Sequence, residues 1–315
     1  MKIFPIFLSG FKCPHNCIYC NPSGTSGFKD IIPIDVILNN VRSSLDSLNI
    51  EYQKKMEVAI YGTDLPSIQC DYVKKLMSEL RKMVENQSIA GIRLSVRPDT
   101  LLFMDSLDGI STIELGVPSM NDDVLKYISR GHRSNTVLKA VDYLRKMGIT
   151  FGFQTMIGLP GGGAREAVES AKKLCALSPN FVRIHPTLVL ANTELCKRFE
   201  SKEYQPLTLD KAVKICAKLV EIYKQKDIRV ARVGFYIPDE LIRHVLVKGP
   251  HHRSFGYLVK SEIHYREMRE YFKQNPTSSI YRVPNQFLSE YVGFKKRNIR
   301  RLRREFGEKI VLKNQ

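Results

Sequence analysis

The sequence alternates short apolar runs typical of β-strands with longer segments of helical periodicity, and this alternation constrains the fold most strongly. Six such pairs follow one another: 3–8 with 34–48, 58–61 with a helix carrying Val73, Leu76, Leu80 and Met83, 92–96 with a short helix near Asp99, 112–117 with helices across 121–146, 149–157 with 164–177, and 181–184 with a helix carrying Ala212, Ile215, Leu219 and Ile222. Alternating strands and helices form parallel sheets through right-handed crossovers. We therefore predict an α/β fold, an incomplete (β/α)6 barrel.

The length and charge of the chain set further limits. Its 315 residues suffice for one barrel-sized domain and an appendage. The start lacks the apolar stretch and cleavage site of a signal peptide, and no run reaches the roughly 18 apolar residues of a membrane span, so a cytoplasmic protein is expected. A net charge of +17 indicates a polyanionic partner such as nucleic acid, although a basic bias of the whole proteome would give the same sum.

Three cysteines, Cys13, Cys17 and Cys20, follow the first apolar run in a CxxxCxxC arrangement, with an aromatic residue just before the last of them. One short loop thus supplies three thiolates, one fewer than the irons of a cubane iron–sulfur cluster. One iron would remain open to bind and reduce another molecule. The spacing therefore predicts a [4Fe–4S] cluster with an open coordination position.

Two other uses of these cysteines have to be weighed. With His15 they could bind zinc, although structural zinc sites usually combine two short cysteine pairs that lie far apart in the sequence. A disulfide framework is disfavoured because seven cysteines in 315 residues are few and odd in number. The remaining cysteines, which lie singly and mostly in apolar helical patterns, are expected to pack in the core: Cys70, Cys175, Cys196 and Cys216.

Glycine and polar residues follow several of the predicted strands. The turn Gly62-Thr63-Asp64 follows the second strand, residues 116–119 (GVPS) follow the fourth, and the glycine-rich segment 156–163 lies at the end of the fifth. In parallel barrels the C-terminal ends of the strands face one mouth, which is also where the cysteine loop would lie. Because glycine lets a ligand approach the backbone closely, these loops predict a ligand site at that mouth.

Four further motifs make a resemblance specific: ELGVPSM at 114–120, RGH at 130–132, GLPG at 158–161 and RIHPTL at 183–188. Together with the cysteine triplet they resemble the radical S-adenosylmethionine (SAM) core of the Elongator catalytic subunit and its bacterial relatives, over roughly residues 1–260. The core is similar, more distantly, to oxygen-independent coproporphyrinogen oxidase. The resemblance implies two cofactors, a [4Fe–4S] cluster and S-adenosyl-L-methionine, and reductive cleavage of SAM to a 5'-deoxyadenosyl radical.

The same resemblance implies roles for individual residues. Cys13, Cys17 and Cys20 would bind the cluster, the turn Gly62-Thr63-Asp64 the SAM amino group, Arg130 the SAM carboxylate and Gln154 the ribose. Tyr19, Ser95 and Gly158 complete the expected cofactor-binding residues. The role of Arg130 agrees with its chemistry, because a guanidinium grips a carboxylate through two parallel hydrogen bonds.

The sequence departs from the family's pattern at two positions. Thr63 stands where the family's second glycine usually lies, and Pro118 stands where glutamine is usual. Proline has no side-chain hydrogen-bond donor, so SAM is held either by fewer contacts or in a different way. A degenerate, inactive relative is the alternative.

Beyond the predicted barrel, the segment 248–256 (KGPHHRSFG) places two histidines after a Gly-Pro turn. This segment is either a plain connection from strand to helix or a site where His251 or His252 carries a proton on the substrate side.

The last forty residues are strongly basic, with ten Lys/Arg against three Asp/Glu between Pro276 and Gln315. Their pattern predicts a strand at 279–283, a helix at 285–291, a turn at 292–299, a helix to 306 and a strand at 309–312. This order resembles the minimal core of a KH domain, whose GxxG turn grips single-stranded nucleic acid, although Lys296 replaces the second glycine. The expected nucleic-acid-binding residues are Gly293, Lys295, Lys296, Arg297, Arg300 and Arg301. A structural cap with a basic surface is the alternative.

We thus expect a radical SAM partial barrel at 1–236, a helical extension or linker at 237–275 and a basic KH-like α+β module at 276–315. The favoured function is a radical SAM enzyme that modifies RNA, with tRNA the most plausible substrate and an external electron donor such as flavodoxin or ferredoxin. Its relatives' acetyltransferase domain is expected to be absent, and sulfur insertion is disfavoured because the other cysteines are dispersed. The alternatives are a radical SAM enzyme acting on a porphyrin-like small molecule or a peptide, and a non-catalytic iron–sulfur RNA-binding protein.

Overall fold

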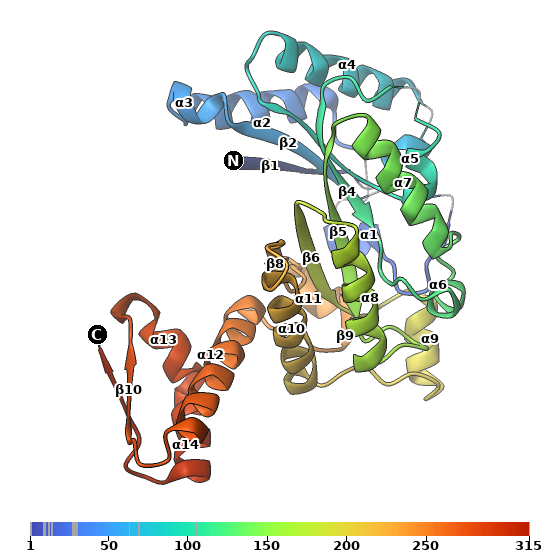
Figure 1. Ribbon diagram of the computed structural model, residues 1–315. Coiled ribbons are helices and arrows are strands. Elements are labelled where there is room, and N and C mark those ends of the chain that lie inside the picture. Colours follow the sequence, from blue (N-terminus) through green and yellow to red (C-terminus); the bar gives the residue numbers. More distant parts are fainter. Residues whose placement is uncertain are drawn as a thin grey trace.

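The computed structural model of the protein describes residues 2–8, 11, 13, 15–26, 31–62, 64–68, 70–104 and 106–314. Within these residues, seven parallel strands form one curved sheet in the order β1-β2-β3-β4-β5-β6-β8 (Figure 1). The strands are β1 (Lys2–Phe7), β2 (Met56–Tyr61), β3 (Gly91–Val96), β4 (Ile110–Gly116), β5 (Thr150–Ile157), β6 (Phe181–Pro186) and β8 (Arg229–Val233). The predicted α/β half-barrel is confirmed.

The strand β8 adds a seventh member to the six strands predicted from sequence. It pairs with β6, with Arg229 opposite Phe181, and it ends the sheet. Its sequence, RVARV, lacks the continuous apolar run of a strand that is covered on both faces. An edge strand does not need such a run, and for this reason the apolar pattern did not reveal it.

Five amphipathic helices cover the outer face of the sheet: α2 (Ile34–Asp46), α4 (Asp71–Glu85), α7 (Ser134–Lys146), α8 (Ala164–Ala176) and α10 (Leu209–Lys224). Their buried residues follow helical spacing, as in α4, where Val73, Leu76, Leu80 and Met83 are buried as predicted. The outer face of the sheet and this layer of helices together form the main apolar core.

Shorter elements connect these layers. They are α1 (Pro22–Ser26), α3 (Ile50–Gln53), η1 (Leu65–Ser67), α5 (Pro98–Leu101), α6 (Asp122–Tyr127), α9 (Glu194–Glu200), α11 (Asp239–Val245), and the antiparallel pair β7 (Val189–Leu190) and β9 (Leu246–Lys248).

The basic C-terminal residues form a small module on the helix α12 (Phe255–Gln274). The module consists of β10 (Ile280–Val283), η2 (Asn285–Phe287), α13 (Leu288–Val292), η3 (Phe294–Lys296), α14 (Arg297–Phe306) and β11 (Val311–Asn314), with β10 and β11 paired in parallel. The predicted order of strand, helix, turn, helix and strand is therefore observed.

The long helix α12 belongs to two cores. Its first turns contribute Phe255 and Val259 to the core of the half-barrel, whereas Tyr265, Met268 and Phe272 pack into the core of the C-terminal module. The expected linker at 237–275 would separate these three side chains from the module residues they contact. We therefore propose that α12 is shared between the half-barrel and the module.

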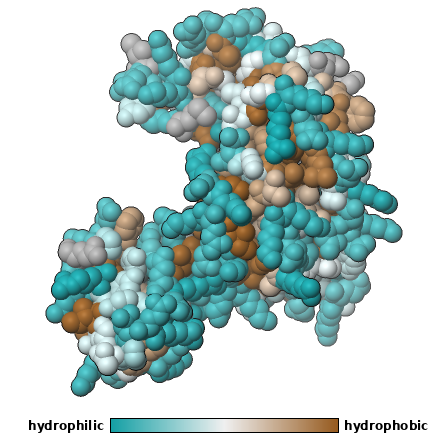
Figure 2. Space-filling view, viewed as in Figure 1, coloured by the Kyte–Doolittle hydropathy of each residue, from teal (hydrophilic) through white to brown (hydrophobic). Residues whose placement is uncertain are grey.

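The molecule is open on one side. Figure 1 shows the edge strands β1 and β8 separated on the side toward which the C-terminal module projects, and Figure 2 shows a mostly hydrophilic surface that is deeply hollowed there. No helix in the described part of the chain combines the length and the apolar character required to cross a membrane.

Candidate active site

The cysteine loop follows β1 at the C-terminal edge of the sheet. Cys17 is buried, Cys13 is partly buried and Cys20 is exposed, and the Cys20 N–H donates to the Cys17 carbonyl at 3.0 Å. Ile18 between them donates its N–H to the Ile128 carbonyl at 3.2 Å and accepts from the Leu195 N–H at 2.8 Å. Hydrogen bonds to the end of α6 and to α9 thus hold this loop in place.

Three free thiols in one loop match the donors that a cubane cluster with one open iron requires. All seven cysteines lie within the described residues and are free. Among the described side chains, no three His, Cys, Asp or Glu groups converge closely enough to hold a single metal ion, and His15 Nε2 lies 3.5 Å from Asp99 Oδ2. In a cubane cluster each thiolate binds a different iron, so the three sulfur atoms need not meet at one point.

Several buried polar atoms on the loops of this rim have no hydrogen-bond partner within the described residues. They are Asp64 Oδ2, Arg97 Nε and Nη1, Asp99 Oδ1, Arg130 Nε and His132 Nε2. Each unsatisfied buried group costs about 1–3 kcal/mol, which a bound ligand can offset. A group of unsatisfied cations and carboxylates beside three thiols fits an anionic cluster together with the charged amino-acid end of SAM.

Arg130 connects these atoms to the cysteine loop. Its Nη1 donates to Cys17 Sγ at 3.5 Å and its Nη2 to the Gly116 carbonyl at 2.7 Å. Burial disfavours its charge, but the neighbouring Tyr19 and Cys17 groups keep the pKa of Arg130 above its ordinary value. Burial, and secondarily the Arg130 guanidinium, lower the pKa of His132 to about 4, so this imidazole is neutral near pH 7. Arg130 is thus a permanent cation beside the cysteines, as its expected contact with a carboxylate requires.

The turn after β2 comes close to the end of β1. Gly62 has a φ of +107°, and a Cβ there would lie 2.5 Å from the Leu8 carbonyl oxygen, so no larger residue fits. Asp64 is buried; its Oδ1 accepts from the Arg97 N–H at 3.0 Å and from Thr100 Oγ1 at 2.8 Å, which leaves Oδ2 for a ligand. Thr63, expected to contact SAM, lies outside the described residues.

The other expected SAM contacts fall into two places. Gln154 and Ser95 meet on the inner face of the sheet, where Gln154 Nε2 donates to Ser95 Oγ at 3.2 Å. Gly158 lies in a separate turn, against Leu207, and its carbonyl accepts from Tyr204 Oη at 2.7 Å. The structure thus joins Tyr19 and Arg130 at the cysteines and Ser95 and Gln154 on the sheet, and it fastens Gly158 to the segment before α10.

Sequence reasoning missed a buried charge network on the inner face of the sheet. Glu114 accepts from Tyr61 Oη at 2.9 Å, Arg93 Nη1 at 3.0 Å and Gln154 Nε2 at 2.8 Å, and Arg183 Nε lies 3.0 Å from it. Arg93 also pairs with Glu57, at 2.8 Å from its Nε. The sequence did hold a clue to this network, because each of four otherwise apolar strands contains one charged residue. Buried charges are rare unless they are paired or functional, so four of them in one sheet indicate a network.

Sequence reasoning also missed Arg97 and Asp99. Arg97, directly after β3, is buried and donates through Nη2 to Asp99 at 3.0 Å and to the Arg130 carbonyl. The clue to these two residues was the polar segment RPD at the C-terminal end of a strand, where the binding and catalytic residues of parallel sheets lie.

The expected nucleic-acid-binding residues have different environments. Arg301 stacks 3.4 Å from the centre of the Tyr265 ring and pairs with Glu262, and Arg297 pairs with Asp210 of α10. These two arginines fasten the module to α12 and α10. The remaining expected contacts lie in or beside the turn that precedes α14: Gly293, Lys295, Lys296 and Arg300.

We predict that the pKa of His185 lies well below that of an ordinary histidine. Burial, together with Arg183 and Arg232, lowers its pKa to about 4, although its Nδ1 lies 2.9 Å from the Gly234 carbonyl. The unfolded chain takes up this proton near pH 6.5, so stability from the neutral imidazole is present above pH 6.5 and is lost as the pH falls toward 4. Histidine ring resonances followed by NMR from pH 8 to pH 4, with the His185→Gln variant as the assignment control, test this. A His185 signal with a midpoint near 6.5 would contradict the prediction.

Comparison with known proteins identifies the family. The sequence matches the Radical SAM superfamily over residues 8–174 and the Radical_SAM C-terminal domain over residues 179–265. The chain belongs to the radical SAM superfamily. It is a radical SAM enzyme, and its family's cofactors are a [4Fe–4S] cluster and SAM. The resemblance inferred from the motifs is confirmed.

More particular relatives are similar at low identity. The tRNA uridine(34) acetyltransferase of Methanocaldococcus infernus is 24% identical over 302 residues, which cover 82% of this chain and 55% of that protein. The heme chaperone HemW of Buchnera aphidicola is 24% identical over 187 residues, covering 58% of this chain and 50% of that protein. The structure of archaeal Methanocaldococcus infernus Elp3 with an N-terminal deletion aligns with a TM-score of 0.59 at 18% identity, covering 88% of this chain and 63% of that one. The chain spans about half the length of these curated relatives, and the solved structure shares its fold.

Proposed function

We propose that this radical SAM enzyme modifies RNA, with tRNA as its substrate. The observation that carries the proposal is the contact between the basic C-terminal module and the rim of the half-barrel: the ring of Phe294 in the module packs edge-on against His252, at 5.7 Å between centroids. A polyanion held by the module would therefore reach the same rim as the cysteine loop.

The turn of the module has the features of a backbone-binding loop. Lys295 and Lys296 both adopt the left-handed conformation, with φ of 51° and 59°, which non-glycine residues rarely adopt. Lys296 thus takes a glycine-like conformation where the KH pattern has its second glycine, while adding a positive charge. Asn298 fixes the turn by donating to the Ser261 carbonyl at 2.8 Å and to the Tyr291 carbonyl at 3.1 Å. Phe287 and Phe294 are exposed nearby and could stack on bases.

The residues of the half-barrel have separate roles in this reaction. When bound, the cluster supplies the electron that splits SAM to the 5'-deoxyadenosyl radical, which activates carbon atoms that acid–base chemistry cannot. Arg130 and Asp64 would hold the charged end of SAM beside the cysteines. The buried network around Glu114 fixes Gln154, which would contact SAM, and holds Arg183 on the inner face of the sheet, where a base would enter. The radical reaction needs an external one-electron donor, for which we propose a flavodoxin or ferredoxin.

The relatives support tRNA but also leave a second candidate. The similarity to the tRNA uridine(34) acetyltransferase covers 82% of this chain, whereas that to the heme chaperone covers 58%. The second similarity favours a small-molecule, porphyrin-like substrate as the competing hypothesis. The basic module favours RNA, since a small porphyrin does not need it.

We expect the Lys295→Glu/Lys296→Glu double variant to lose RNA affinity at least about tenfold. Two fewer phosphate contacts should also reduce the slope of log affinity against log salt by about 1.4, at roughly 0.7 per phosphate of a single strand. Fluorescence anisotropy with total tRNA and with a short oligoribonucleotide measures both quantities.

A matched control is Lys139→Glu/Lys146→Glu, which makes the same charge change on exposed residues of α7. This control should bind nearly as the unaltered protein does. If both double variants bind equally, the module is not the RNA site. If the unaltered protein binds no RNA, the RNA substrate is wrong.

A further inference from the structure

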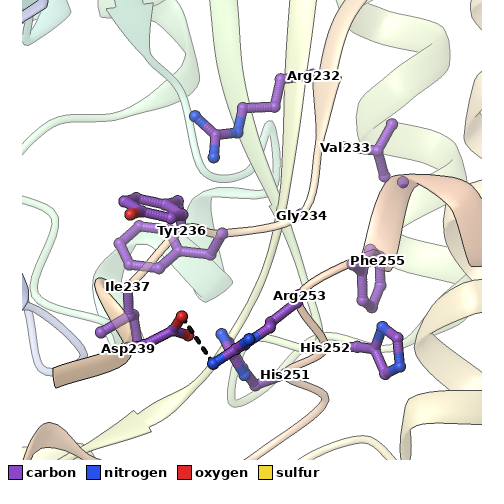
Figure 3. Close-up of a pocket in the computed structure, with 12 residues that line it drawn as sticks. Arg232, Val233, Gly234, Tyr236, Ile237, Asp239, His251, His252, Arg253 and Phe255 are labelled. Carbon is purple, nitrogen blue, oxygen red and sulfur yellow. Dashed lines mark ion pairs between the residues drawn. The ribbon is translucent and has the colours of Figure 1, made fainter. Parts of the chain in front are cut away.

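A cavity of about 190 Å³ lies where the strand β8 and the helix α12 meet, at the C-terminal rim of the sheet. Its polar lining includes Arg232, Tyr236, Asp239 and the stretch His251–Arg253 (Figure 3). The cluster, SAM and their expected contacts use none of these residues. The cavity is therefore a site that the radical chemistry does not account for.

The charges around the cavity favour an anion. Arg253 pairs with Asp239 at 2.7 Å, as the dashed line in Figure 3 marks, so these two charges cancel. Arg232 has no carboxylate within ion-pair distance among the residues that the structure describes. It remains the uncompensated cation of the cavity.

The side chain of Arg232 is exposed to solvent and lies beside a second cation. It stands directly opposite Arg183 in the parallel pairing of β6 and β8, and like charges across a sheet repel. Arg183 is neutralised by Glu114 at 3.0 Å, whereas Arg232 has only the Tyr236 ring, 5.8 Å from its guanidinium carbon. Partial burial and the Arg183 charge lower the pKa of Arg232. A bound anion would remove this repulsion.

The N-terminus of α12 adds to the positive electrostatic potential of the cavity. This helix has 20 residues and no acidic residue in its first turn, and Ser254 at its N-cap makes no side-chain capping hydrogen bond. The positive end of the helix dipole thus lies at the cavity, and the one carboxylate of the cavity lining, Asp239, is paired with Arg253. Near it, His252 accepts the Ser254 N–H through Nδ1 at 3.0 Å, which leaves Nε2 for a ligand.

The cavity is continuous with the C-terminal module. His252 packs edge-on against Phe294, and Lys295 Nζ lies 5.6 Å from the centre of that ring. Tyr257 of α12 donates to the Ser289 carbonyl at 2.7 Å, so the module is fastened to the helix that begins at the cavity. The basic turn and the cavity therefore form one surface along α12.

We propose that this cavity binds a backbone phosphate of a single-stranded RNA segment, with Arg232 and His252 as its ligands. This inference rests on the proposed function and specifies how its substrate is held. The module would grip the strand at Lys295 and Lys296, and the cavity would hold the next phosphates at the rim. The nucleotide beyond them would lie over the inner face of the sheet.

The experiment measures RNA binding by Arg232→Ala, His252→Ala and the charge-retaining Arg232→Lys, with Lys146→Ala on α7 as the matched control. The probe is a fluorescein-labelled, single-stranded oligoribonucleotide of mixed sequence, titrated at several salt concentrations. Loss of a charged phosphate contact should weaken binding about tenfold in Arg232→Ala and reduce the salt slope by about 0.7. Arg232→Lys should recover most of the slope, and Lys146→Ala should bind as the unaltered protein does.

Two further readouts separate phosphate binding from a structural role. Arg232→Ala should melt no lower than the unaltered protein, because it removes the like-charge contact with Arg183, while its RNA affinity falls. Circular dichroism spectra of all variants should agree. If Arg232→Ala retains the affinity and salt slope of the unaltered protein, the cavity is not a phosphate site, although the proposed RNA substrate survives. If the unaltered protein binds no RNA, both proposals fail.

Discussion

We expect the Cys17→Ser variant to bind no intact [4Fe–4S] cluster and to release no 5'-deoxyadenosine from SAM. A serine hydroxyl replaces the soft thiolate that iron requires, and the two cysteines that remain hold too few irons to retain a cubane cluster. Iron and sulfide content after anaerobic reconstitution, together with chromatographic detection of 5'-deoxyadenosine under dithionite, measure the loss. Activity should fall to the limit of detection.

The matched control for this loss is Cys70→Ser. Cys70 stands at the N-cap of α4 with extended backbone and makes no side-chain capping hydrogen bond. Serine is a favoured N-cap residue, so this variant should fold and react as the unaltered protein does, or be slightly more stable. If Cys17→Ser retained iron and activity while Cys70→Ser lost them, the cysteine triplet would not be the cluster site.

The central strands of the half-barrel were predictable because strands buried on both faces are almost continuously apolar, and the edge strand β1 was predictable from its own apolar run. The six predicted strands lie within two residues of the observed bounds, as in 149–157 against Thr150–Ile157. The strand β8 was missed because two arginines interrupt its short apolar run. The segment 237–275 was predicted as a helical extension or linker, and the sequence does not show that the two halves of α12 pack in separate cores.

The candidate site was predictable only where a motif carries the chemistry. Cysteine spacing predicted the cluster loop, and the RGH motif led to Arg130, which the structure places at Cys17. The partners that satisfy buried groups lie far apart in sequence, as with Tyr61 and Glu114 or Arg97 and Asp64. Periodicity reports burial and not pairing, so such contacts need the three-dimensional structure. For the same reason the sequence could not show that Arg297 and Arg301 fasten the module instead of facing solvent freely.

We expect Glu114→Ala to destabilise the protein by about 3 kcal/mol or more. Glu114 is fully buried and lies within 3.0 Å of both Arg93 and Arg183. Its removal leaves Arg183 without a carboxylate in a buried setting, and losing one partner of a buried ion pair typically costs 3–5 kcal/mol. Thermal unfolding of the reconstituted protein should show a midpoint about 5–10 °C lower.

The contrast is Glu169→Ala, which removes the same side chain from a surface pair on α8. Glu169 lies 3.5 Å from Lys172, both side chains are more than half exposed, and such pairs contribute at most about 1 kcal/mol. The midpoint should hardly move. Equal losses in the two variants would mean that the inner-face network does not hold the sheet together.

Because Gln154 donates to the same carboxylate, Glu114→Ala should also weaken SAM binding, whereas Glu169→Ala should leave it unchanged. The network therefore links the stability of the half-barrel to the orientation of a residue expected to contact SAM.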